Sequence, residues 1–216
     1  MKNSFLFWLS CPHKTHTSID KIKWNCKSST ALGIDEVPEW QDWSNRATTE
    51  DQVRIEEVLK GLDLSQKNLL HVGVGNSELA QKFHKHTRCI DGITIQEPEV
   101  SKAHAMDLSG YHVILCSKFS EELVEKLDGN YDFIIDNNPA AFACCKKHFY
   151  TMIKSYVKLL KPGGEIITDK LGLGWSSPDN DSRWRLSPEH WFEIGAHFKL
   201  QSVRYDESVL ALRKAP

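Results

Sequence analysis

Short apolar segments alternate with helical patterns from Asn68 to Thr168, and this alternation restricts the fold more than any other feature of the sequence. Because parallel strands need long crossover connections, strands separated by helices favour a parallel sheet covered on both faces. We therefore expect an α/β, doubly wound sheet. The predicted strands are Leu69–Val74, Cys89–Ile95, Val113–Cys116, Tyr131–Asp136 and Glu165–Thr168. The helical patterns run through Leu79, Ala80 and Phe83, over Glu121–Leu127, and along a longer stretch that ends near Leu160, before Lys161-Pro162-Gly163-Gly164.

The end of the chain follows a different pattern. Ser187 and Pro188 predict the start of a helix, with serine as N-cap and proline in the first turn. After this helix, Leu200–Tyr205 and Val209–Arg213 are predicted strands with three residues between them. So short a link allows only an antiparallel hairpin. The sequence therefore predicts a mostly parallel, seven-stranded sheet that ends in a C-terminal antiparallel hairpin strand.

Residues 1–46 show no sustained periodicity, yet they hold Trp8, Trp24, Trp40 and Trp43. Disordered segments are poor in aromatic residues, so we expect an ordered N-terminal arm that packs on a domain formed by residues 47–216. The domain begins with a predicted helix. Its signals are a capping-box pattern at Thr49 and Gln52 and apolar residues at helical spacing, namely Ile55, Val58, Leu59 and Leu62.

Composition restricts the compartment and the partners. The formal net charge of −2 gives no general electrostatic reason to bind nucleic acid or an anionic membrane, so we expect neither partner. The apolar run Phe5–Leu9 is too short for a secretory leader or a bilayer span. The six cysteines form no CxxC pair, which favours a reducing cytoplasm. The spacing of Cys11, His13, His16 and Cys26 fits no zinc finger, so we interpret these as loop residues.

Four segments resemble, in order, the motifs of class I S-adenosylmethionine-dependent methyltransferases over residues 48–213. They are Leu69–Ser77, where a strand runs into a glycine-rich turn, then Gly92–Ile95, Asp132–Asn138 and, as the strongest match, Leu159–Ile167. The resemblance implies a Rossmann-like methyltransferase fold for residues 47–216. It also implies S-adenosyl-L-methionine as the cofactor and a methyl acceptor as the second substrate. Glycine in the first motif lets the backbone approach a ligand closely.

The resemblance assigns the cofactor pocket to His71, Gly73, Gly75, Ser77, Thr94, Gln96, Ser117, Asp136 and Asn137. Three positions that are commonly acidic in the family hold His71, Thr94 and Ser117 here, and Ser77 replaces a third glycine. The acid at the end of the second strand usually takes both ribose hydroxyls. Without it the pocket lacks a strong charge-assisted acceptor, and we expect Thr94→Asp to hold or improve the affinity for the cofactor.

Asp136, His148 and Asp169 are the candidate catalytic residues. Asp136 and Asp169 end neighbouring predicted strands, so their carboxylates are expected to converge. Related sugar O-methyltransferases hold Mg²⁺ at such strand ends, but Asp136 is followed here by asparagine rather than by further acids, and we predict no metal site. His148 lies in the long helix and His190 near the start of the last one, where either is a candidate base near neutral pH.

The segment from Lys170 to Leu186 follows the fifth strand and carries Arg183 and Arg185. A long loop at this edge commonly covers the acceptor, so we expect it to form a lid together with residues 1–46. The expected acceptor is a small molecule, and the arginines favour a sugar or a carboxylate-bearing metabolite. The loss of three acids leaves an alternative open: a non-catalytic methyltransferase-like module that binds or stabilises a partner.

Overall fold

The computed structural model of the protein describes residues 42–143, 146–174 and 185–216. Some predicted features lie outside these ranges: Trp8, Trp24, Trp40, Arg183 and the group Cys11, His13, His16 and Cys26. No helix in the described ranges is long and apolar enough to cross a bilayer.

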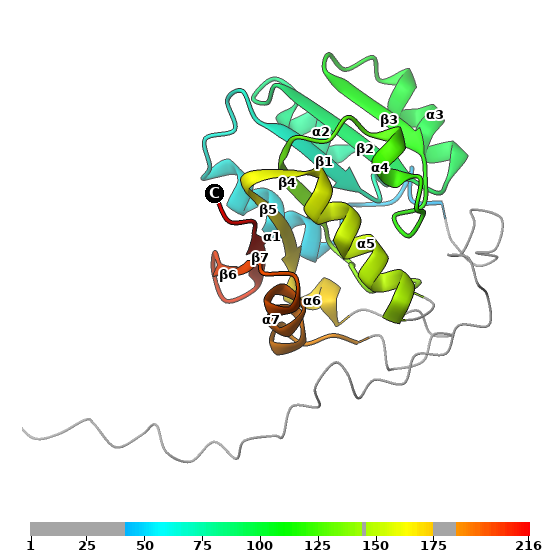
Figure 1. The fold of residues 1–216 in the computed structure, drawn as a ribbon. Helices are drawn as coiled ribbons and strands as arrows, with labels where there is room; N and C mark the ends of the chain where they lie inside the picture. Colours follow the sequence, from blue (N-terminus) through cyan, green and yellow to red (C-terminus); the bar gives the residue numbers. More distant parts are fainter. Residues whose placement is uncertain (1–41, 144–145, 175–184) are drawn as a thin grey trace, which may run out of the picture.

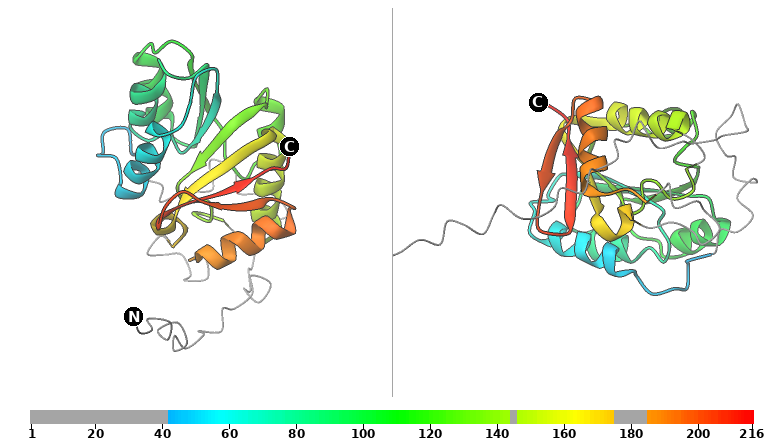
Figure 2. Two further views of the ribbon diagram at one scale, coloured as in Figure 1. Left: turned by 90° about the vertical axis from the view of Figure 1, so that its left-hand side faces the viewer. Right: turned by 90° about the horizontal axis from the view of Figure 1, so that it is seen from below.

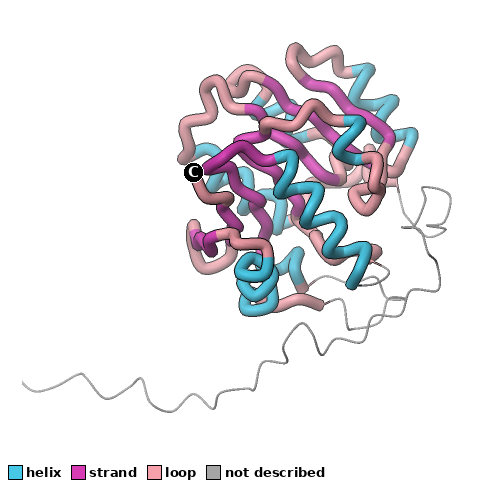
Figure 3. Tube along the Cα trace, in the orientation of Figure 1, coloured by secondary structure: helices cyan, strands magenta, loops and turns pink. Residues whose placement is uncertain are grey.

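The strands of the described chain form one sheet in the order β3-β2-β1-β4-β5-β7-β6 (Figures 1 and 3). β1 to β5 are parallel to one another, whereas β7 is antiparallel to both β5 and β6. The mostly parallel seven-stranded sheet and its terminal hairpin are therefore confirmed. The bounds are β1 Asn68–Val72, β2 Cys89–Thr94, β3 Tyr111–Leu115, β4 Tyr131–Asp136, β5 Leu160–Asp169, β6 Gln201–Arg204 and β7 Val209–Arg213.

Helices cover both faces of this sheet, as Figures 1 and 2 show. One face carries α1, α2 and α3, and its core includes Ile55, Leu69, Ile135 and Ile167. The other face carries α4, α5 and α7, with Ile134, Phe149, Ile166 and Trp191 among its core residues. Neighbouring residues of a strand point to opposite faces, which is why Ile134 and Ile135 belong to different cores. The helices are α1 Glu50–Lys60, α2 Glu78–Phe83, α3 Glu97–Ala105, α4 Leu123–Lys126, α5 Lys146–Leu159, α6 Lys170–Leu173 and α7 Pro188–His197.

The main local differences from the sequence expectations concern α3, the start of α1 and the start of β5. α3 was not predicted, although Pro98 in its first turn favours a helix start. The capping box at Thr49 does not form: the Thr49 side chain makes no capping hydrogen bond, and the Gln52 side-chain amide donates to Glu56 along the helix. β5 begins at Leu160, well before the predicted Glu165, and its register against β4 shifts between Tyr131 and Phe133. The predicted cap of α7 is confirmed: Ser187 accepts from the His190 N–H, while the His190 ring accepts from the Ser187 N–H.

Candidate functional site

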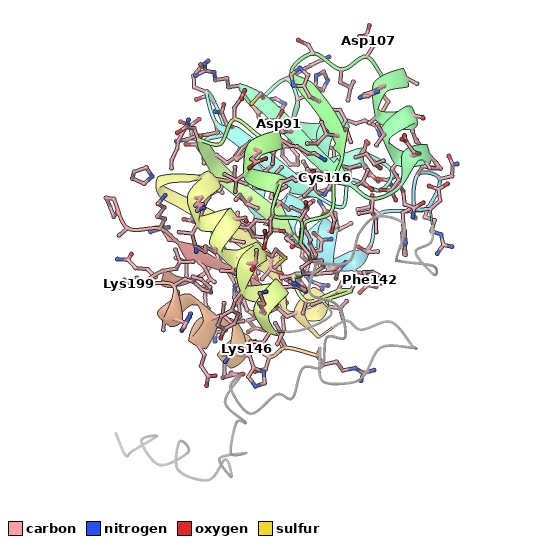
Figure 4. All side chains as sticks on the ribbon, turned by 45° about the vertical axis from the view of Figure 1, so that its right-hand side comes forward. Asp91, Asp107, Cys116, Phe142, Lys146 and Lys199 are labelled. Carbon is pink, nitrogen blue, oxygen red and sulfur yellow. The ribbon has the colours of Figure 1, made fainter. Side chains whose placement is uncertain are left out.

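A cavity of about 850 Å³ lies at the carboxyl ends of the parallel strands. Its walls come from the turns after β1, β3 and β4, the end of β2, the first turns of α1, and residues 43 and 46–49. Cys116 and Phe142, both labelled in Figure 4, belong to its lining. The strand order reverses between β1 and β4, so the cavity sits where ligands bind in open α/β sheets. Its volume falls in the upper part of the range of about 300–1,000 Å³ for small-molecule sites.

The turn after β1 needs the left-handed backbone conformation at Gly73, Gly75 and Ser77, whose φ angles are 76°, 50° and 62°. A Cβ added to Gly73 would meet nothing within 4 Å, so this residue leaves open space beside the backbone. A Cβ on Gly75 would lie 3.6 Å from the Cβ of Trp43 instead. Gly73 is therefore the glycine that keeps the cavity open, whereas Gly75 packs against residue 43.

A buried carboxylate stands behind the end of β2. Glu99, on α3, is fully buried, and its Oε2 accepts from Thr94 Oγ1 at 2.5 Å and from the Gly75 N–H at 3.2 Å. Its Oε1 accepts from the Trp43 N–H at 3.1 Å. Burial raises the pKa of this carboxyl, and these hydrogen bonds oppose the rise. Glu99 lines the cavity and places an acid beside Thr94, where the sequence had indicated the loss of one.

A second buried group forms on the other face of the sheet. Lys118 Nζ lies 3.2 and 3.1 Å from the two carboxylate oxygens of Asp136 and donates to the Asn138 carbonyl at 2.6 Å. The Tyr156 hydroxyl donates to Asp136 Oδ2 at 2.9 Å. Burial lowers the pKa of Lys118, and Asp136 opposes that shift. Asp136 and Lys118 both line the cavity, so the carboxylate predicted for catalysis already carries a cation as its partner.

Asp169 does not converge with Asp136. Ile135 pairs with Ile167, so Asp136 lies opposite Thr168 and Asp169 is one residue further along. Because side chains alternate between faces, the two aspartates point to opposite sides of the sheet. The buried Asp169 carboxylate accepts two hydrogen bonds from Arg54, both of 2.8 Å, and a third from the Leu171 N–H. It ties α1 to the end of β5 and does not line the cavity, so the expected convergence was wrong.

The remaining predicted residues divide by position. His71, Thr94, Ser117 and Asn137 line the cavity, but Ser77, Gln96 and His148 do not. Ser77 Oγ lies 2.9 Å from the Tyr111 hydroxyl, and the Gln96 N–H donates to Thr94 Oγ1. His148 is buried on α5. The described residues contain no cluster of three potential metal-ligating side chains.

Unpaired polar atoms gather on the cavity wall. Among the described residues, six buried side-chain nitrogen or oxygen atoms have no hydrogen-bond partner. Four of them belong to residues that line this cavity: Gln52 Oε1, His71 Nδ1, Asn137 Oδ1 and Asn138 Oδ1. Burial lowers the pKa of His71 to about 4, so its ring is neutral near pH 7. Because buried polar groups normally find partners, this concentration indicates a site for a polar ligand.

No protein-family model matches the sequence, and the search of curated proteins finds no significant match. Solved structures do match. The N-methyltransferase NodS from Bradyrhizobium japonicum WM9 gives a TM-score of 0.57 at 16% identity, over 76% of this chain and 96% of its own. The amino pentose methyltransferase CalS10 from Micromonospora echinaspora gives 0.58 at 10% identity, over 76% and 89%. The chain has the Rossmann-like methyltransferase fold.

Methyltransferases of this fold that match the chain differ in what they modify. A putative rRNA-methylase from Clostridium thermocellum also matches, with a TM-score of 0.53 at 11% identity over 79% of this chain and 99% of its own. The residues of the cavity wall that sequence reasoning missed include Glu99 and Lys118. The signal for Glu99 was an acid five residues after the end of β2, and the signal for Lys118 was a basic residue in the turn after β3.

Proposed function

We propose that this protein is an S-adenosylmethionine-dependent methyltransferase that acts on a small-molecule acceptor. The observation that supports it best is the cavity at the reversal point of the sheet, with its unpaired polar atoms and its buried acid. Solved structures of similar fold include CalS10 with S-adenosylmethionine bound and NodS in complex with S-adenosyl-L-homocysteine. The small-molecule size of the cavity and the net charge of −2 favour a small acceptor over a nucleic acid.

The residues on the wall fit the cofactor. Gly73 leaves room beside the backbone for a ligand to approach. Glu99 and Thr94 supply acceptors for ribose hydroxyls, with Glu99 taking the role of the acid that Thr94 lacks. His71 presents an unpaired nitrogen on a neutral ring, and Asn137 an unpaired amide oxygen. We assign these residues to cofactor binding.

The chemistry that the cofactor supplies, when bound, is an electrophilic methyl group on a sulfonium. The protein contributes alignment and exclusion of water, which are the main accelerating effects for an in-line displacement. Asp136 is held rigid by Lys118 and Tyr156, and it positions the acceptor rather than acting as a free base. Lys118 also fixes the turn after β4 through the Asn138 carbonyl.

The test is calorimetric titration of S-adenosylmethionine and S-adenosylhomocysteine into the full chain. Both are expected to bind, and Glu99→Gln is expected to weaken binding by about tenfold, because a charged acceptor becomes a neutral amide. Glu125→Gln, an exposed position on α4, is the matched control and should bind like the wild type. The absence of binding heat for both compounds would overturn the proposal and favour the non-catalytic module.

A further inference from the structure

A basic depression lies beside the cavity. It has a volume of about 600 Å³ and is lined by Arg54, Lys170 and Arg185 together with Glu50, Leu171, Gly174 and Ser208. The depression and the cavity share Glu50 and Leu171, so they are adjacent across these two residues. The described residues of this wall carry three positive charges, on Arg54, Lys170 and Arg185, and one negative charge, on Glu50. The buried Asp169, which pairs with Arg54, reduces the positive excess to one charge.

The fold fixes the guanidinium of Arg54 and the backbone of Lys170. Arg54 is fixed through its Nε and one terminal nitrogen, which form the bidentate pair with Asp169. Its other terminal nitrogen lies 3.8 Å from Glu50. Lys170 directly follows Asp169, and its backbone N–H donates to the Ser208 carbonyl at 2.8 Å. Guanidinium and ammonium groups presented together on a recessed surface suit an oxyanion such as phosphate or carboxylate.

On the cavity side of Glu50 and Leu171, two side chains offer hydrogen-bond acceptors. Gln52 comes from α1, like Glu50, and its Oε1 is buried without a partner. Asn138 lies against α6: a Cβ built on Gly172 would come 3.0 Å from its unpaired Oδ1. Both atoms are amide oxygens, so a ligand that satisfies them must donate N–H or O–H groups. Figure 1 shows α6 next to α7 at the end of β5.

We propose that the methyl acceptor is a molecule with two unlike ends. Its hydroxyl- or amine-bearing end enters the cavity toward Gln52 and Asn138, and its oxyanion stays outside in the depression at Arg54 and Lys170. This assignment rests on the proposed methyltransferase function and names the chemical class of the acceptor. Methyl transfer forms a bond from methyl carbon to the acceptor's oxygen or nitrogen, breaks the sulfonium bond, and releases the acceptor's proton.

The experiment titrates inorganic pyrophosphate, and separately malonate, into the full-length protein with and without saturating S-adenosylhomocysteine. Pyrophosphate is expected to bind in both conditions without displacing S-adenosylhomocysteine, because the depression lies beyond Leu171. Lys170→Gln should weaken this binding by about fivefold to tenfold. The matched control Lys158→Gln changes an exposed lysine at the opposite end of β5 and should leave it unchanged. Malonate binding as tight as that of pyrophosphate identifies a carboxylate-bearing acceptor, and preference for pyrophosphate a phosphorylated one.

Several results would overturn the inference while leaving the cofactor proposal intact. They are binding of neither probe, equal affinity in wild type and Lys170→Gln, and competition between pyrophosphate and S-adenosylhomocysteine. If pyrophosphate binds through Lys170 but S-adenosylhomocysteine does not bind at all, the depression is an oxyanion site. In that case the proposed function fails, and the acceptor assignment with it.

Discussion

Replacing Thr94 with aspartate restores the acid that the methyltransferase motif commonly carries, yet the structure predicts a loss of stability. Thr94 Oγ1 lies 2.5 Å from Glu99 Oε2, and both residues are buried. The change would therefore bring two carboxylates to about 4 Å of each other. At an effective dielectric constant of about 20, this repulsion costs about 4 kcal/mol. The expectation from sequence alone, that Thr94→Asp holds or improves cofactor affinity, stays a prediction, and the structure adds this cost in stability.

The cost has a pH dependence whose sign follows from the direction of the pKa shift. Burial already raises the pKa of Glu99, and a second carboxylate raises it further. At pH values above the usual carboxyl pKa, the folded variant therefore binds more protons than the unfolded chain. Its free energy of unfolding consequently falls as the pH rises. Urea unfolding should show a deficit for Thr94→Asp at pH 7.5 that shrinks toward pH 5.

The double variant Thr94→Asp, Glu99→Gln keeps a single carboxylate at this place and provides the control. It should recover most of the lost stability, which gives a coupling energy of several kcal/mol in the double-mutant cycle. It should also bind S-adenosylhomocysteine more tightly than Glu99→Gln alone. A Thr94→Asp single variant that is as stable as the wild type at pH 7.5 would refute the reasoning.

Other consequences are open to direct measurement. Lys118→Met leaves a buried carboxylate without its cation and should lower the free energy of unfolding by about 3–5 kcal/mol. Lys118→Arg should recover part of this loss. A loss below about 1 kcal/mol in Lys118→Met would contradict the ion pair. Gly73→Ala and Gly163→Ala both place a side chain at φ 76° with nothing within 4 Å, so they should cost similar stability, but only Gly73→Ala should weaken S-adenosylhomocysteine binding. Deleting residues 1–41 should preserve that binding, whereas deleting 1–46 should weaken it; equal affinities would show that residues 42–46 do not support the pocket.

The order of the elements was predictable because apolar periodicity and turn residues carry it. β4 and β7 have the predicted bounds, since each is a short apolar run between clear turn signals. α3 was missed because its sequence, Glu97–Ala105, presents few apolar residues to a helical pattern. That omission concealed Glu99, whose position depends on the helix that carries it.

The sequence did not predict to which face of the sheet the side chains at the strand ends point. A sequence shows where a strand ends but not how it pairs, and an offset of one residue reverses the face of a side chain. Asp136 and Asp169 illustrate this: both end their strands, yet β4 and β5 pair so that the two carboxylates diverge. Lys118 was missed for a related reason, because its partner Asp136 is 18 residues away in the chain.

The three hydrogen bonds of Glu99 couple the segment before α1 to the glycine turn after β1. One carboxylate holds the backbone N–H groups of both Trp43 and Gly75, so neither can be released without changing the other's acceptor. A ligand that orders the turn is therefore expected to order residue 43 as well, because both depend on the same carboxylate. The indole of Trp43, which lies 4.7 Å from the Arg46 guanidinium, is thus an intrinsic fluorescent reporter placed at the rim of the cavity. Its emission should change on ligand binding, which titration with S-adenosylhomocysteine would measure directly.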